Sequence, residues 1–247
     1  MGELRRHFHT DLGWIEDELA RLMAYVTEAI PRATGVLLDQ DLEGADYVIA
    51  GDDEIDARTI DVEERCFQVF ALQAPVAGDL RTVVAALKIA GEIERSADLV
   101  VNICKGARRI YGHPLDPKLR GLIGKMSEQA HQLWSAVTAC YAEHDAVKAS
   151  AIDDMDSFLD DLQKQFIQAI FESHAGGRID LPVAVQLAVI CRFYERIGDH
   201  AVNISERIRY QVTGWVPEHA GAARHRAAVA RAAHPTAGEL GPSGEPT

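Results

Sequence analysis

Apolar residues recur at steps of three and four along most of the chain, and this spacing predicts α-helices. Alternation of the strand type is missing, and Gly and Pro fall mainly between the apolar runs. The first helix is expected from Leu12 through Ile30, with Pro31 compatible with an end, a kink or a further turn or two. Asp79 is placed to cap a helix that opens at 78. The remaining helices are expected at about 41 to before Pro75, 78 to about 109, 116–141, 145–174 and from about 180.

The chain contains an internal repeat. Residues 87–109 and 188–210 align at an offset of 101, and the polar residues match at least as well as the apolar ones. Six helices in two sets of three predict an all-α fold of two tandem antiparallel three-helix bundles related by a pseudo-twofold repeat. We expect the first bundle at 1–112 and the second at 113–214. Residues 215–247 have almost no large apolar side chain and are expected to form a disordered tail.

Each repeat carries an ExxxD pattern on one helical face. Glu94, Asp98 and Asn102 fall within about 80° of one another, opposite the apolar face, at ~100° per residue. Glu195, Asp199 and Asn203 repeat this stripe. Two carboxylates four residues apart disfavour a helix by ~0.2–0.5 kcal/mol, so their repetition indicates a role other than packing. A lone pattern of this kind would be read as an ordinary solvated face.

The preceding helix of each half supplies further carboxylates. Asp53 and Asp56 correspond to Asp153 and Asp156 at an offset of 100, and each pair shares one helical face. If neighbouring helices turn these faces together, each half gathers four carboxylates. Carboxylate oxygens suit hard cations, that is Mg, Ca, Mn or oxidised Fe, whereas Zn usually also takes His or Cys. The identity of a bound metal stays open among Fe, Zn, Mg, Mn and Ca.

Composition narrows the classes of function. A net charge of −13 argues against a nucleic-acid surface and suits cations or basic partner segments. No apolar run reaches the ~20 residues of a membrane span, and the N-terminus lacks the apolar region of a signal peptide. The four cysteines form no CxxC pair, as expected of reduced core thiols in a cytoplasmic protein.

The segments ERIGDHAVNI (195–204), ERSADLVVNI (94–103) and PVAGDLRTVVAALKI (75–89) closely resemble the PhoU family of phosphate-signalling regulators. The resemblance covers roughly residues 10–214. It implies two three-helix bundles, usually in a homodimer, and association with the phosphate ABC transporter and a sensor histidine kinase. It also implies repression of the phosphate-starvation response, and in some members iron or zinc clusters on the ExxxD surfaces. In the first copy the family's Ile-Gly is replaced by Ser96-Ala97.

The resemblance assigns a metal role to Glu94, Asp98, Glu195 and Asp199, with Asp53, Asp56, Asp153 and Asp156 as supporting candidates. Asn102 and Asn203 are either further ligands or residues that cap or bridge helices. Arg95 and Arg196 are expected to hold or neutralise the carboxylates. His200 lies ~100° from Asp199 around the helix, which favours a structural role over ligation.

Two further classes of function compete with a regulator. A ferritin-type di-iron protein would require ExxH on two helices, and only Glu128 and His131 form one. A metal-free structural adaptor would leave the acidic faces without a specific ligand. No phosphate-binding loop or nucleophile elbow is found, so we expect no enzymatic activity.

Overall fold

The computed structural model describes residues 2–216, with side chains from residue 7 onward. Within this range every regular element is an α-helix, which confirms the predicted all-α class. The expected tail falls mostly in 217–247, outside the described residues. None of the described helices combines the length and apolar character that a membrane span requires. The helices are α1 (Gly2–Asp39), α2 (Leu42–Ala50), α3 (Asp52–Gln73), α4 (Ala77–Arg109), α5 (Pro117–Glu143), α6 (Ala146–Ala149), α7 (Ile152–Ala175) and α8 (Leu181–Thr213).

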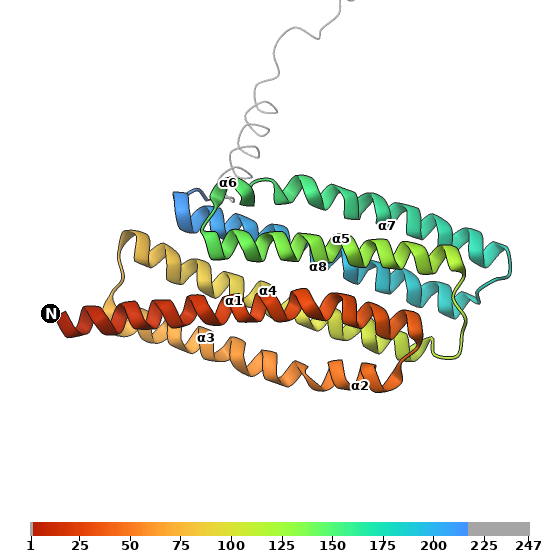
Figure 1. Ribbon diagram of the computed structural model, residues 1–247, viewed down its shortest axis with the longest axis horizontal. Helices are drawn as coiled ribbons and strands as arrows, with labels where there is room; N and C mark the ends of the chain where they lie inside the picture. The colour runs from red at the N-terminus through yellow and green to blue at the C-terminus, as the bar shows by residue number, and fades with distance from the viewer. Residues whose placement is uncertain (1, 217–247) are drawn as a thin grey trace, which may run out of the picture. The chain divides into compact units, whose positions relative to one another are not determined.

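The long helices form two antiparallel three-helix bundles, α1–α3–α4 and α5–α7–α8 (Figure 1). This arrangement confirms the tandem-bundle prediction. The first helix continues through Pro31 to Asp39, so the proline does not end it. Asp116 caps α5 by accepting a hydrogen bond from the Lys118 N–H at 2.9 Å.

The second helix of each half is broken, and the prediction of one continuous helix there is wrong. In the first half Asp41 caps the short α2, and the chain turns at Gly51 before α3. A Cβ at Gly51 would approach the Tyr25 hydroxyl at 2.8 Å. In the second half Asp145 caps α6, and the Ser150 side chain donates to the Val147 carbonyl at 2.7 Å. The Ser150 side-chain bond competes with helix continuation at the second break, while at the first break the Gly51 N–H donates to the Val48 carbonyl at 3.2 Å.

The start of α4 also differs from the prediction. The helix begins at Ala77, and its N-cap residue is Val76, which makes no side-chain capping bond. Asp79 lies inside the first turn, so its predicted role as the cap is wrong. Its negative charge there still interacts favourably with the helix dipole.

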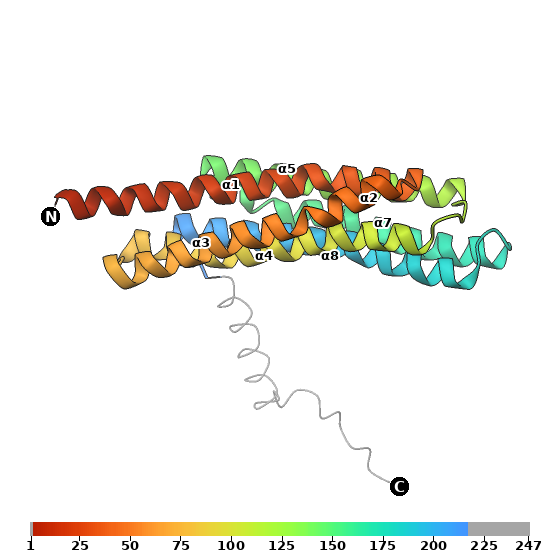
Figure 2. The same ribbon diagram turned by 90° about the horizontal axis from the view of Figure 1, so that it is seen from below.

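The two halves share one continuous apolar core. Helix α4 packs along α8, and α1 packs against α5 (Figure 2). Gly106 permits the close approach of α4 and α8, since a Cβ there would lie 2.8 Å from Ile190 Cγ1. The Trp134 indole donates to the Ile197 carbonyl at 3.0 Å within the second half. All four cysteines are free thiols in the interior.

Candidate functional site: two carboxylate clusters

The first cluster lies between α3 and α4. Asp52 and Asp56 come from α3, and Glu94 and Asp98 come from α4. Burial raises the pKa of the Glu94 carboxyl, and the negative charges of Asp98 and Asp56 raise it further. Burial and the same two aspartates raise the pKa of Asp52. These mutual effects show that the four carboxylates share one electrostatic environment.

The second cluster lies between α7 and α8. Its two α7 residues lie one helical turn further along that helix than the two α3 residues lie along α3. Asp156 and Asp160 come from α7, and Glu195 and Asp199 come from α8. Burial raises the pKa of Asp156 to about 7, with further contributions from Asp160, Asp199 and Glu195. Burial also raises the pKa values of Glu195 and Asp199. A carboxyl group with a pKa of about 7 is protonated in mild acid and only about half ionised at neutral pH, because burial disfavours its charged form.

Gly198 explains why Asp156 can sit so deeply. A Cβ built on Gly198 would lie 2.4 Å from Asp156 Oδ1 and 2.7 Å from Leu159 Cδ2. The Asp156 carboxylate therefore occupies the space over the α8 backbone where any other residue would place its side chain. The first repeat has buried Ala97 at the matching position, and its Asp56 is exposed. The two clusters are consequently alike in composition but different in depth.

The structure brings together six of the eight predicted ligand residues, namely Glu94, Asp98, Asp56, Glu195, Asp199 and Asp156. Asp53 and Asp153 are exposed and have only minor effects on their neighbours. Sequence reasoning missed Asp52 and Asp160. Asp52 lies four residues before Asp56, and Asp160 lies four residues after Asp156. This is the same spacing as in the ExxxD pattern. That spacing was the signal available in the sequence.

The arginines around the clusters form ion pairs with glutamates of their own helix. Arg95 pairs with Glu92 at 2.8 Å, and its positive charge also offsets part of the rise in the pKa of Glu94. Arg196 offsets a small part of the rise in the pKa of Asp199. Arg192, which the sequence did not single out, forms the ion pair with Glu195. Each cluster thus keeps an excess of negative charge.

A buried polar contact joins the two halves beside the second cluster. Glu92 Oε2 on α4 lies 2.6 Å from His200 Nδ1 and accepts a hydrogen bond from Asn203 Nδ2 at 3.1 Å. Although burial opposes ionisation, these hydrogen bonds lower the pKa of Glu92. His200 and Asn203 therefore bridge helices. Asn102, the counterpart of Asn203, is half-buried on α4.

The donor chemistry of the clusters fits a hard cation. Asp52 Oδ1 and Glu195 Oε2, one from each cluster, are buried and lack a hydrogen-bond partner. Oxygen atoms of this kind are the ligands that Mg, Ca and Mn prefer. In the described part of the chain, however, no three His, Cys, Asp or Glu side chains converge in the arrangement of a metal site. Direct coordination would therefore require side-chain rotation.

Comparisons with known proteins agree with this architecture. The profile of the PhoU domain matches residues 19–107 and again 123–208. The "Phosphate-specific transport system accessory protein PhoU homolog 2" of Mycobacterium tuberculosis is 33% identical over 215 residues, 87% of this chain and 100% of that protein. The "PhoU homolog 1" of Mycobacterium leprae is 32% identical over 216 residues, covering 87% and 96%.

Solved structures give the same result. The "phosphate transport system regulatory protein PhoU" of Streptococcus pneumoniae superimposes with a TM-score of 0.77 at 25% identity, covering 84% of this chain and 98% of that one. The PhoU structure from Pseudomonas aeruginosa gives a TM-score of 0.79 at 24% identity, covering 84% and 100%. The names of these proteins describe accessory or regulatory roles and not an enzymatic reaction. Because the family profile matches more than half of the chain, the chain belongs to the PhoU domain family.

Proposed function

We propose that this protein is a non-enzymatic accessory regulator of phosphate transport that represses the phosphate-starvation response. In this role it acts in the cytoplasm as a homodimer and couples the ATPase of the phosphate ABC transporter to a sensor histidine kinase. Membership of the PhoU domain family and the accessory and regulatory names of its relatives support the proposal. The observation that carries it is the pair of carboxylate clusters repeated on α3–α4 and α7–α8.

The clusters are suited to binding positive charge. Each places four carboxylates on two adjacent helices, and burial together with mutual repulsion raises pKa values in both. Ionised carboxylates in such a position are destabilised, and a cation or a basic partner surface relieves that cost. Binding at the second cluster is therefore coupled to release of the proton that Asp156, with its pKa of about 7, partly retains near neutral pH. A hard metal ion would supply the positive charge that neutralises the cluster.

Glu94, Asp98, Asp52 and Asp56 would hold a metal ion in the first half, and Glu195, Asp199, Asp156 and Asp160 in the second. The exposed Asp98 and Asp199 and the half-buried Glu94 and Glu195 stand on α4 and α8. These are the two helices that pack against each other where the halves meet. A ligand at either cluster thus acts on a helix of the shared interface. Coupling follows if the ligand binds two arrangements of that interface with different affinity.

A metal-free adaptor is the second candidate function. It is favoured by the finding that no three potential ligands converge in the described part of the chain. In that case the clusters would recognise Lys or Arg side chains of a partner directly. A ferritin-type di-iron protein has no such support, because Glu128 and His131 form a single ExxH pattern and lie on α5, which supplies no residue to either cluster.

Two experiments test the regulator and its partners. Deleting the gene should release a phosphate-repressed reporter in high phosphate, and unchanged repression in the absence of a paralogue would refute the regulator. Affinity purification of the protein in high and low phosphate should recover the kinase and the transporter ATPase, with at least one yield dependent on phosphate. Recovery of neither partner under both conditions would contradict the proposed coupling.

Metal analysis separates the metal-binding form from the adaptor. The protein is purified without a histidine tag, beside Glu94→Ala/Asp98→Ala and Glu195→Ala/Asp199→Ala. A lower metal content in each double variant than in the parent would support coordination by the clusters. Equal metal content in all three proteins would exclude these residues as ligands and leave the adaptor.

A further inference from the structure

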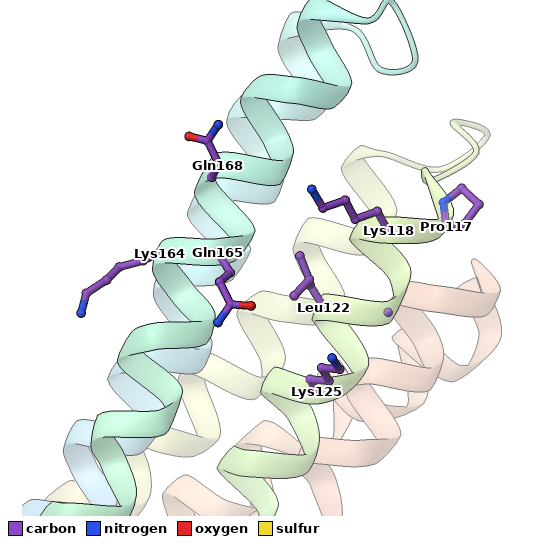
Figure 3. Close-up of a pocket in the computed structure, with 8 residues that line it drawn as sticks. Pro117, Lys118, Leu122, Lys125, Lys164, Gln165 and Gln168 are labelled. Atoms are coloured by element: carbon purple, nitrogen blue, oxygen red, sulfur yellow. The ribbon is translucent and has the colours of Figure 1, made fainter.

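A groove between α5 and α7 has a chemical character opposite to that of the carboxylate clusters. Its volume is about 640 Å³, within the usual range of ligand pockets. None of the residues that line it carries a carboxylate, although the chain has a net charge of −13. Lys118 and Gln165 project into the space between the helices, while Lys164 extends away from α5 (Figure 3). The polar lining consists of Lys118, Lys125, Lys164, Gln165 and Gln168.

The lysines of the groove are available to an incoming anion. Lys118 Nζ lies 2.7 Å from Glu172 Oε2, and Lys164 pairs with Asp161 at 2.9 Å, but all four of these side chains are largely exposed. Exposed ion pairs of this kind contribute only ~0–1 kcal/mol, so a multivalent anion can replace the carboxylates. Within the described residues, no carboxylate lies within 4.0 Å of the Lys125 ammonium group.

The first half of the same chain shows how this groove would be closed. The capping residues Asp41 and Asp145 align α1 with α5 at an offset of 104, and the breaks before α3 and α7 align those helices at an offset of 100. In the first half, Arg58 Nε reaches from α3 to Glu18 Oε1 on α1 at 2.6 Å. The aligned positions of the second half hold Phe158 and Leu122, which cannot form this bridge.

A second bridge is lost in the same way. Arg65 of α3 lies over the Trp14 ring of α1, with the guanidinium carbon 4.8 Å from the ring centre, and also binds Asp11 at 2.7 Å. In the second half, Gln165 stands at the position of Arg65, and Lys118 stands at the position of Trp14. Both replacements remove a cross-helix contact and leave a hydrogen-bond donor in the groove. The second half therefore lacks the two bridges that join α1 and α3 in the first half, and it places Lys118 and Gln165 as hydrogen-bond donors between α5 and α7.

We propose that the α5–α7 groove binds a linear oligophosphate anion, meaning a chain of two or more linked phosphoryl groups. Lys118 and Lys125 are seven residues apart on α5, which separates them by ~10.5 Å along the helix. A chain of phosphoryl groups can contact both ammonium groups across this distance, whereas one orthophosphate would require the two lysine side chains to bend toward each other. The Gln165 amide adds a donor to the remaining oxygens, whereas the Gln168 amide already donates to Glu172 Oε1 at 3.1 Å. A peptide would require apolar anchors, but Leu122 at the floor is only 8% exposed.

Calorimetric titration of the full chain tests the site, with inorganic triphosphate as the probe. Orthophosphate and a glutamate peptide of matched charge serve as competing ligands. Lys118→Gln/Lys125→Gln removes two charges from the groove, and Lys148→Gln/Arg109→Gln removes two charges elsewhere. Saturable binding of triphosphate should weaken by at least about tenfold in the groove variant and remain in the control, because charge-assisted bonds to phosphate are lost.

A third variant separates the groove from simple charge. Leu122→Glu/Phe158→Arg copies the Glu18–Arg58 bridge, keeps every lysine and leaves the net charge unchanged. It should abolish binding while circular dichroism shows a folded helical protein. Equal affinity in the parent and Lys118→Gln/Lys125→Gln, equal loss in the control, or equally tight binding of orthophosphate or the glutamate peptide would overturn the proposal. If the bridged variant does not fold, the two charge variants still decide the question.

Discussion

Replacing Asp156 by Asn should make the protein more stable in mild alkali and leave it nearly unchanged in mild acid. The folded state holds the pKa of Asp156 at about 7, while the ordinary value is 3.8. Because the folded-state pKa is the higher one, unfolding releases a proton between these two values. Stability therefore falls as pH rises through this window, and the loss is complete above about pH 7.

The size of the effect follows from the same shift. Each pKa unit corresponds to ~1.4 kcal/mol, so a shift of about three units sets an upper limit of about 4 kcal/mol. Of that range, about two units lie between pH 5 and pH 7. Partial exposure of Asp156 screens the charge and reduces the difference between pH 5 and pH 8 to ~1–2 kcal/mol. Asn is isosteric with the protonated acid and carries no charge to ionise.

Urea unfolding of the parent and Asp156→Asn at pH 5 and pH 8, with chelator present to remove metal, measures this difference. The free energy of unfolding of the variant should exceed that of the parent by ~1–2 kcal/mol more at pH 8 than at pH 5. Asp56→Asn is the matched control, because Asp56 is the exposed counterpart in the first cluster. An equal pH dependence in parent and Asp156→Asn, or the same gain in Asp56→Asn, would refute the reasoning.

Three further substitutions test the contacts that hold the site together. Glu92→Ala should lower the free energy of unfolding by ~2 kcal/mol near neutral pH, because it leaves the buried His200 and the half-buried Asn203 without their hydrogen-bond partner. This loss should become smaller in acid, where Glu92 of the parent is protonated. A pH-independent loss in urea titrations would contradict that account. Gly198→Ala should destabilise by ~1–3 kcal/mol through the clash with Asp156, whereas Gly121→Ala, with open space around it, should be neutral or stabilising by up to ~1 kcal/mol. Similar melting temperatures for these two variants would rule out the close contact. Gly106→Ala should lower the free energy of unfolding by ~1–3 kcal/mol, because the added methyl group pushes α4 away from α8. Unchanged stability would show that the interface accommodates the methyl group without cost.

The repeat made most of the fold predictable from the sequence. Apolar periodicity located all six long helices, because each one buries a stripe at the helical spacing. The breaks at Gly51 and at Ala151 were missed, since apolar spacing runs across both turns and only local hydrogen bonds interrupt the helix. Asp79 looked like a cap by residue type, but the backbone begins the helix two residues earlier.

The sequence predicted that the candidate site consists of carboxylates on two neighbouring helices, but it identified only some of the residues. Glu94 and Asp98 could be placed on one face from their spacing alone. Which residues of the preceding helix face them depends on how that helix is rotated, and the rotation selects Asp52 and not Asp53. The depth of Asp156 depends on the missing side chain of Gly198, an effect between helices that no pattern within one helix reveals.

The most direct test of the central claim is repression of a phosphate-controlled reporter in a deletion strain that carries a variant with both clusters neutralised. Glu94→Gln, Asp98→Asn, Glu195→Gln and Asp199→Asn together remove four charges and change side-chain volume very little. The account predicts that this variant is folded and present at the parent level but fails to repress the reporter in high phosphate. Full repression by the variant would contradict the claim that the carboxylate clusters carry the function.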